Sequence, residues 1–110
     1  MNARQADEHA RKVADAAIWD AWHASIVADS IAEDLEPQAA TATLKSLADR
    51  WVEIIKPDSD REHIAAAMAD LARMSRIALG FLEGIPANED AAFVLMQARD
   101  RLVAAAEAFR

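Results

Sequence analysis

A chain of 110 residues, of which 54% are hydrophobic and 28% charged, is long enough for one modest core and too short for two, so disorder and a multidomain organisation are both excluded. A net charge of −7 argues against direct binding to nucleic acid or to anionic membranes. The lack of cysteine excludes disulfides, thiolate metal sites and a cysteine nucleophile.

The residue usage is that of a helical protein, because the chain holds 28 alanines but only 2 glycines and 3 prolines. The first predicted helix covers residues 2–35, since no helix breaker occurs before Pro37. The second covers residues 37–56, with Pro37 in its first turn and Pro57 just beyond its end.

The third predicted helix covers residues 60–83. Ser59 and Glu62 have the spacing of a capping box at its start, and Gly84 can take the left-handed conformation that ends helices. The fourth covers residues 88–109, with Asn88 as its cap and Glu89 in its first turn. Short connections favour antiparallel neighbours, so we expect one domain over residues 1–110, an all-α, up-down four-helix bundle with a long first helix.

Helical periodicity predicts which side of each helix is buried. In the first helix the predicted seam is Ala6, Ala10, Val13, Ala17, Ala24, Val27, Ile31 and Leu35. In the second it is Leu44, Leu47, Ala48, Trp51, Ile54 and Ile55. In the third it is Ile64, Met68, Leu71, Ser75, Ala78 and Leu82, and in the fourth Ala91, Leu95, Ala98, Leu102, Ala106 and Phe109.

Two apolar patches lie away from these seams. One comprises Trp19, Trp22 and Ile26, with Ile18 beside them, and the other comprises Met74, Ile77 and Phe81. Each patch is either covered by a neighbouring helix or exposed as a protein-binding surface. If both are exposed, a two-fold axis that pairs a patch with itself is the simplest way to cover them, so we expect a homodimer.

Acidic residues gather at the predicted end of the first helix, where Glu33, Asp34 and Glu36 form an acidic surface. Carboxylates at a helix C-terminus are unfavourable, so this cluster suggests a basic partner or a tolerated solvated end. The pairs Asp20/His23 and Asp60/His63 have a spacing that can hold a metal, but each is a weak signal that surface residues also produce. We therefore predict no metal and no cofactor.

Neither a glycine-rich phosphate loop nor a nucleophile motif occurs, so we expect a protein that is not an enzyme. The leading hypothesis is a small acidic interaction module, homodimeric, that acts by binding another protein. The first alternative is an acidic inhibitor of the phage type, such as an anti-CRISPR, anti-nuclease or immunity protein, that blocks a nucleic-acid-binding machine. The second is a metal-dependent hydrolase of the all-α pyrophosphohydrolase kind, using Glu33, Asp34, Glu36 and His63.

The opening residues lack the apolar segment of a signal peptide, and no apolar run is long enough to span a bilayer. We expect a cytoplasmic protein without a membrane partner.

Overall fold

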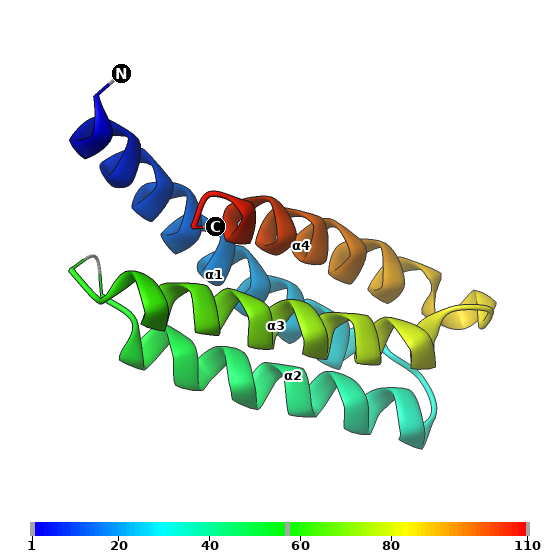
Figure 1. The fold of residues 1–110 in the computed structure, drawn as a ribbon. Coiled ribbons are helices and arrows are strands. Elements are labelled where there is room, and N and C mark those ends of the chain that lie inside the picture. Colours follow the sequence, from blue (N-terminus) through cyan, green and yellow to red (C-terminus); the bar gives the residue numbers. More distant parts are fainter. Residues whose placement is uncertain (1, 57, 110) are drawn as a thin grey trace.

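Four helices run up and down in a bundle whose long dimension is 48 Å and whose two short dimensions are 23 and 17 Å (Figure 1). The computed structural model describes residues 2–56 and 58–109. Within them the helices are α1 (Ala3–Ile31), α2 (Leu35–Ile54), α3 (Arg61–Leu82) and α4 (Glu89–Glu107), and a single 3-10 turn, η1 (Pro86–Asn88), precedes α4. The predicted fold class is confirmed.

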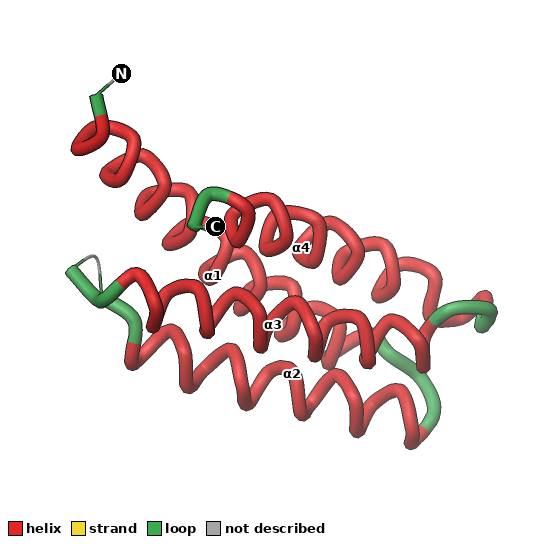
Figure 2. The backbone as a smooth tube through the Cα atoms, in the orientation of Figure 1, coloured by secondary structure: helices red, strands yellow, loops and turns green. Residues whose placement is uncertain are grey.

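Each helix packs against the next along the chain, and α4 returns to pack against α1. This arrangement places the two ends of the described chain at the same end of the bundle (Figures 1 and 2). The first turns of α1 extend beyond the other three helices (Figure 1). None of the helices in the described ranges combines the length and the hydropathy needed to cross a membrane.

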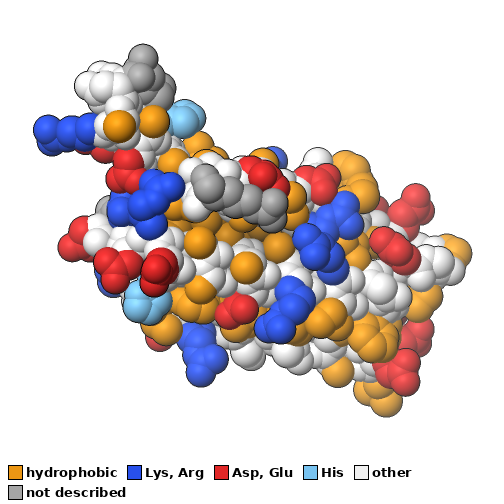
Figure 3. Space-filling model, viewed as in Figure 1, with side chains coloured by type: hydrophobic (Ala, Val, Ile, Leu, Met, Phe, Trp, Pro, Cys, Tyr) orange, Lys and Arg blue, Asp and Glu red, His pale blue; other side chains and the backbone are white. Residues whose placement is uncertain are grey.

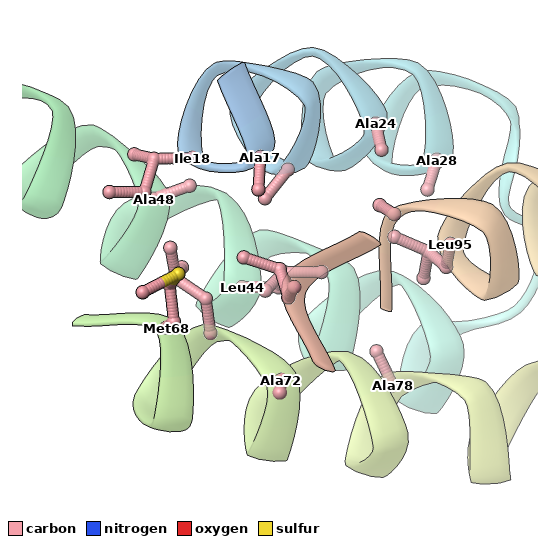
Figure 4. Close-up of a cluster of buried hydrophobic side chains, with 14 of the residues drawn as sticks. Ala17, Ile18, Ala24, Ala28, Leu44, Ala48, Met68, Ala72, Ala78 and Leu95 are labelled. Carbon is pink, nitrogen blue, oxygen red and sulfur yellow. The ribbon is translucent and has the colours of Figure 1, made fainter. Parts of the chain in front are cut away.

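The core consists mainly of alanine on α1 and of alanine together with larger side chains on the other helices. Leu44, Met68, Leu71, Leu82, Leu95 and Leu102 are fully buried. Figure 4 shows Leu44 and Met68 pointing into the space between the helices, opposite Ala17, Ile18 and Ala48. Small residues on α1 let its neighbours approach closely, while the leucines fill the volume that remains.

The predicted seams of α2, α3 and α4 are largely correct, and that of α3 is buried throughout. Ile54 is the exception on α2, with 49% of its surface exposed. The seam of α1 is wrong in part, because Val13, Val27 and Ile31 lie at the exposed margin and Ile18 is buried. The buried side of α1 is centred on Ala14, Ala21 and Ala28. Alanine occurs on several sides of this helix, so hydrophobic periodicity does not distinguish this side from the predicted seam.

The connection between α1 and α2 begins earlier than predicted. α1 ends at Ile31 instead of residue 35, and Leu35 opens α2 with 84% of its surface exposed. Asp34 makes the turn with φ 72° and ψ 154°, a backbone conformation that residues other than glycine rarely adopt. Pro37 is in the first turn of α2, as predicted, so the chain reverses direction three residues before the proline.

The start of α3 also differs from its prediction. Asp60 is the N-cap residue and makes no side-chain capping hydrogen bond, while the Ser59 hydroxyl accepts a hydrogen bond from the Lys56 backbone amide at 2.9 Å. The predicted capping box is therefore absent, because Ser59 lies one residue too early. Gly84, by contrast, has φ 80° just after the end of α3, as expected.

Arg61, in the first turn of α3, contacts both α1 and the segment that follows α4. It forms an ion pair with Asp7 of α1, and its guanidinium lies 4.6 Å from the centre of the Phe109 ring. Arg11 also binds Asp7, at 2.8 Å, and donates to the Ser59 carbonyl. Hydrogen bonds from Arg11 and then Arg61 lower the pKa of Asp7 below its ordinary value. These contacts fix the overhanging part of α1 to the loop before α3.

Asn88 closes the opposite end of the bundle. Its side chain is completely buried and bridges the chain at Glu33, accepting from the Glu33 amide at 2.6 Å and donating to the Glu33 carbonyl at 3.2 Å. Asn88 does precede α4, as predicted, but its side chain makes no capping hydrogen bond to that helix. The residue therefore holds the α1–α2 connection against the start of α4.

Candidate protein-binding groove

An apolar groove of about 370 Å³ runs along the surface between α2 and α3. One wall comes from α3 and is made of Met74, Ile77 and Phe81, three side chains that the sequence predicted as a protein-binding patch. Ile77 and Phe81 are 46% and 43% exposed, and Met74 is half-buried. The patch is therefore a partly open surface and is not covered by a neighbouring helix.

The other wall, on α2, is made of small side chains. Ala39, Ala40 and Thr43 line it, and Glu36 lies at its start. Side chains of this size do not reach across to α3, so the larger residues opposite remain uncovered. Sequence analysis missed this wall, although residues 36, 39, 40 and 43 have the spacing of one helical face.

One end of the bundle carries almost all of the net charge. Residues 31–44 and 77–98 contain six of the 19 carboxylates and none of the 12 lysines and arginines. The remainder of the chain has 13 acidic and 12 basic residues and is nearly neutral. We call these six residues the acidic end; its members are Glu33, Asp34, Glu36, Glu83, Glu89 and Asp90.

All six side chains of the acidic end belong to exposed residues. They surround the end of the bundle where α2 and α4 begin and α3 finishes, and the groove opens toward it at Glu36. Figure 3 shows acidic side chains at this end, on the right of the view, beside hydrophobic side chains over α2 and α3, whereas basic side chains lie along the middle and left.

The electrostatic prediction for Glu33, Asp34 and Glu36 is wrong in one respect. Glu36 lies in the first turn of α2, not at the end of α1, and Glu89 and Asp90 lie in the first turn of α4. Carboxylates are favourable at helix N-termini, so part of the acidic end stabilises the fold. Its six side chains nevertheless belong to exposed residues, and neither sequence stretch contains a lysine or an arginine.

The tryptophan patch lies on a different side of the molecule. Trp19 is 43% exposed, while Trp22 is half-buried against the core and donates its indole hydrogen to Asp49 of α2. The two indoles meet edge to face, with centroids 5.5 Å apart. Ile26 is half-buried one turn further along α1. Trp22 thus has a structural role, and Trp19 provides most of the exposed surface.

The residues of the other hypothetical sites are not brought together. His63 lies in the first turn of α3, at the opposite end of the bundle from Glu33, Asp34 and Glu36. Asp20 forms a 3.1 Å ion pair with Arg101 of α4 instead of a metal site with His23. Over residues 2–56 and 58–109, no three His, Cys, Asp or Glu side chains are placed to hold one metal ion.

Other exposed apolar side chains escaped the sequence analysis. Phe93 on α4 is 55% exposed, and Met96 on the same helix is 40% exposed. The core positions Leu95 and Ala98 alternate with them closely enough that periodicity alone does not separate the two sets.

Comparison with known protein families, curated protein sequences and solved structures finds no match to this chain.

Proposed function

We propose that this protein is a small interaction module that binds another protein at the α2–α3 groove, and that the partner presents a surface both apolar and basic. The observation that carries the proposal is the opening of an exposed apolar groove onto six exposed carboxylates whose two sequence stretches contain no lysine or arginine. The two properties select the same partner, because the groove favours apolar side chains and the acidic end favours cations.

Two contributions support affinity at this surface. Covering the exposed parts of Ile77 and Phe81 contributes about 1–2 kcal/mol for each side chain, from the apolar area removed from water. The six carboxylates act mainly on the association rate and on partner choice, and salt weakens their effect over a Debye length of about 8 Å at physiological ionic strength. Binding should therefore be weakened, but not abolished, by salt.

The localisation of charge also supports the inhibitor alternative. A surface that normally holds a nucleic-acid backbone is basic, and an acidic end of this kind can occupy it. In that case the partner is a nucleic-acid-binding protein and the complex excludes its nucleic acid. A bound partner that retains full affinity for its nucleic acid would reject the inhibitor alternative while leaving the interaction module in place.

We also propose that two copies associate through the tryptophan patch of α1. Self-association at the groove with the two copies parallel would bring two acidic ends together, and these repel each other. The face that carries Trp19 belongs to the nearly neutral remainder of the chain, so a second copy meets no such barrier there. Trp19 supplies the apolar anchor of this interface.

Affinity capture with matched variants tests the groove. Ile77→Asp places a charge in the groove, and Phe93→Asp makes the same kind of change at an exposed site on α4, which does not line it. Wild type and Phe93→Asp should retain the same basic protein from native cells, and Ile77→Asp should lose it. Equal capture by all three proteins would refute the proposal, provided that circular dichroism shows each variant folded.

Light scattering behind a sizing column tests self-association. A dimer has twice the chain mass of 12.0 kDa, and Trp19→Asp should convert it to a monomer while Ile77→Asp leaves it intact. If the wild-type protein stays monomeric at all concentrations up to about 1 mM, any dimer has an association free energy weaker than roughly 4 kcal/mol, and the proposed dimer is refuted.

A further inference from the structure

The occupant of the groove is defined further by the shapes of its two walls. We infer that it is an amphipathic α-helix of the partner, about three turns long, which runs parallel to α2 with its basic residues at its N-terminal end. This inference rests on the proposed function, since it describes the segment that the groove receives.

The shape of the groove fits a helix. Met74, Ile77 and Phe81 follow one another at intervals of three and four residues, so they form a ridge on α3 that spans about 10 Å at 1.5 Å per residue. A helix lying beside this ridge meets it with side chains at i, i+3 or i+4, and i+7. Two turns contact the ridge and one further turn reaches the acidic end, which gives about three turns.

The small wall allows the backbone of the partner to come close. With Ala39, Ala40 and Thr43 facing it, a helix can pack at the short end of the usual range of interaxial distances, about 8 Å. An extended strand gains nothing here, because helices α2 and α3 satisfy their own backbone hydrogen bonds and offer no sheet edge. The walls therefore favour a helix over an extended peptide.

Charge along the groove sets the direction of that helix. Glu36 and the rest of the acidic end lie at one end. Toward the other end are Arg50, two turns beyond Thr43 on the same face of α2, and Arg73, which pairs with Asp70 at 3.6 Å just before Met74. The positive N-terminus of a helix is favoured at the acidic end and its negative C-terminus near the arginines. Because α2 itself begins at the acidic end, the bound helix is parallel to α2.

Two synthetic peptides test this inference directly. Both have 14 residues, the same composition, leucines at the i, i+3, i+7 and i+10 positions, and a hydrocarbon staple on the outward face that equalises their helix content. One carries three lysines in its first turn and three glutamates in its last, and the other has these two groups exchanged. Fluorescence anisotropy of dye-labelled peptides gives the two dissociation constants in 50 and 500 mM salt.

The inference predicts that the peptide with N-terminal lysines binds about three- to tenfold more tightly in 50 mM salt, because the other peptide can place its lysines at the acidic end only with its helix dipole reversed. The difference should shrink in 500 mM salt. Ile77→Asp should abolish this binding, Thr43→Trp should weaken it at least tenfold by filling the groove without adding charge, and Phe93→Asp should not weaken it.

Equal affinities, a preference for the other peptide, or binding that survives Ile77→Asp would overturn the inference. Failure of both peptides to bind would also overturn it. If cellular capture remains dependent on Ile77 in any of these cases, the proposed function stands and only the helical occupant is wrong. If Ile77→Asp instead converts a dimer to a monomer, the occupant is a second copy of this chain and both proposals fail.

Discussion

Replacing Asn88 by alanine should destabilise the protein by about 2–4 kcal/mol, a large part of the 5–15 kcal/mol typical of a domain. The side chain is completely buried and makes two hydrogen bonds to the backbone of Glu33, at 2.6 and 3.2 Å. Each such bond contributes about 1 kcal/mol net, and a backbone group of Glu33 that stays shielded from water without its partner adds up to about 2 kcal/mol.

A serine at the same position separates this role from helix capping. Serine caps a helix about as well as asparagine, so Asn88→Ser should preserve stability if the residue acts on α4. Because the side chain bridges to Glu33 instead, we expect Asn88→Ser to be nearly as destabilised as Asn88→Ala. Urea unfolding followed by circular dichroism gives both values. A loss below about 0.5 kcal/mol for alanine, or full stability with serine, would refute the bridging role.

Three other substitutions have defined outcomes. Asp34→Gly should raise stability by about 1 kcal/mol in urea unfolding, because glycine adopts φ 72° without strain; a decrease would show that the turn is unstrained. Leu71→Ala should lower it by about 2–5 kcal/mol, since Leu71 is fully buried, and a loss under 1 kcal/mol would contradict that burial. Because the pKa of Asp7 is lower in the folded state, its ionised carboxylate stabilises the fold above the unfolded pKa of about 3.9, and this stabilisation is lost as the pH falls through the folded pKa. Acidification should therefore lower the Tm of Asp7→Asn less than that of the wild type. Parallel Tm curves between pH 7 and 2 would contradict this.

The architecture could be predicted from the sequence because breakers and periodicity agree on four helices. The buried side of α3 followed directly from regular spacing, as Met68 and Leu71 show. The buried side of α1 was harder, because alanine occurs on several of its faces and only tertiary packing selects Ala14 and Ala21 over Val13 and Val27.

The two ends of the bundle show what local rules leave out. Asn88 has the identity and position of an N-cap, yet its side chain binds Glu33, which is 55 residues away in sequence. No local pattern contains that contact. The α1–α2 boundary was misplaced because Asp34 adopts a conformation typical of glycine, so the usual signal for a turn is absent.

Only the α3 wall of the groove could be predicted from the sequence. Met74, Ile77 and Phe81 stand out as a second apolar face on the third helix, and the structure leaves them partly exposed. The small wall of α2 and the approach of Glu36 depend on the rotation of α2 about its axis, which the sequence of that helix alone does not determine. The acidic end likewise requires the topology, because its six carboxylates come from two stretches that are far apart in the chain.

Site-specific crosslinking tests the docking of a partner in the groove most directly, and the lack of native cysteine makes it simple. A single cysteine that carries a benzophenone group is introduced at one of two positions, Thr43→Cys in the groove or Ala104→Cys at an exposed site on α4. Each labelled protein is irradiated in native cell extract at low and high salt. Docking in the groove predicts one salt-sensitive adduct with a basic protein from position 43, lost with Ile77→Asp, and none from position 104. The same adducts from both positions, or none from position 43, would contradict it.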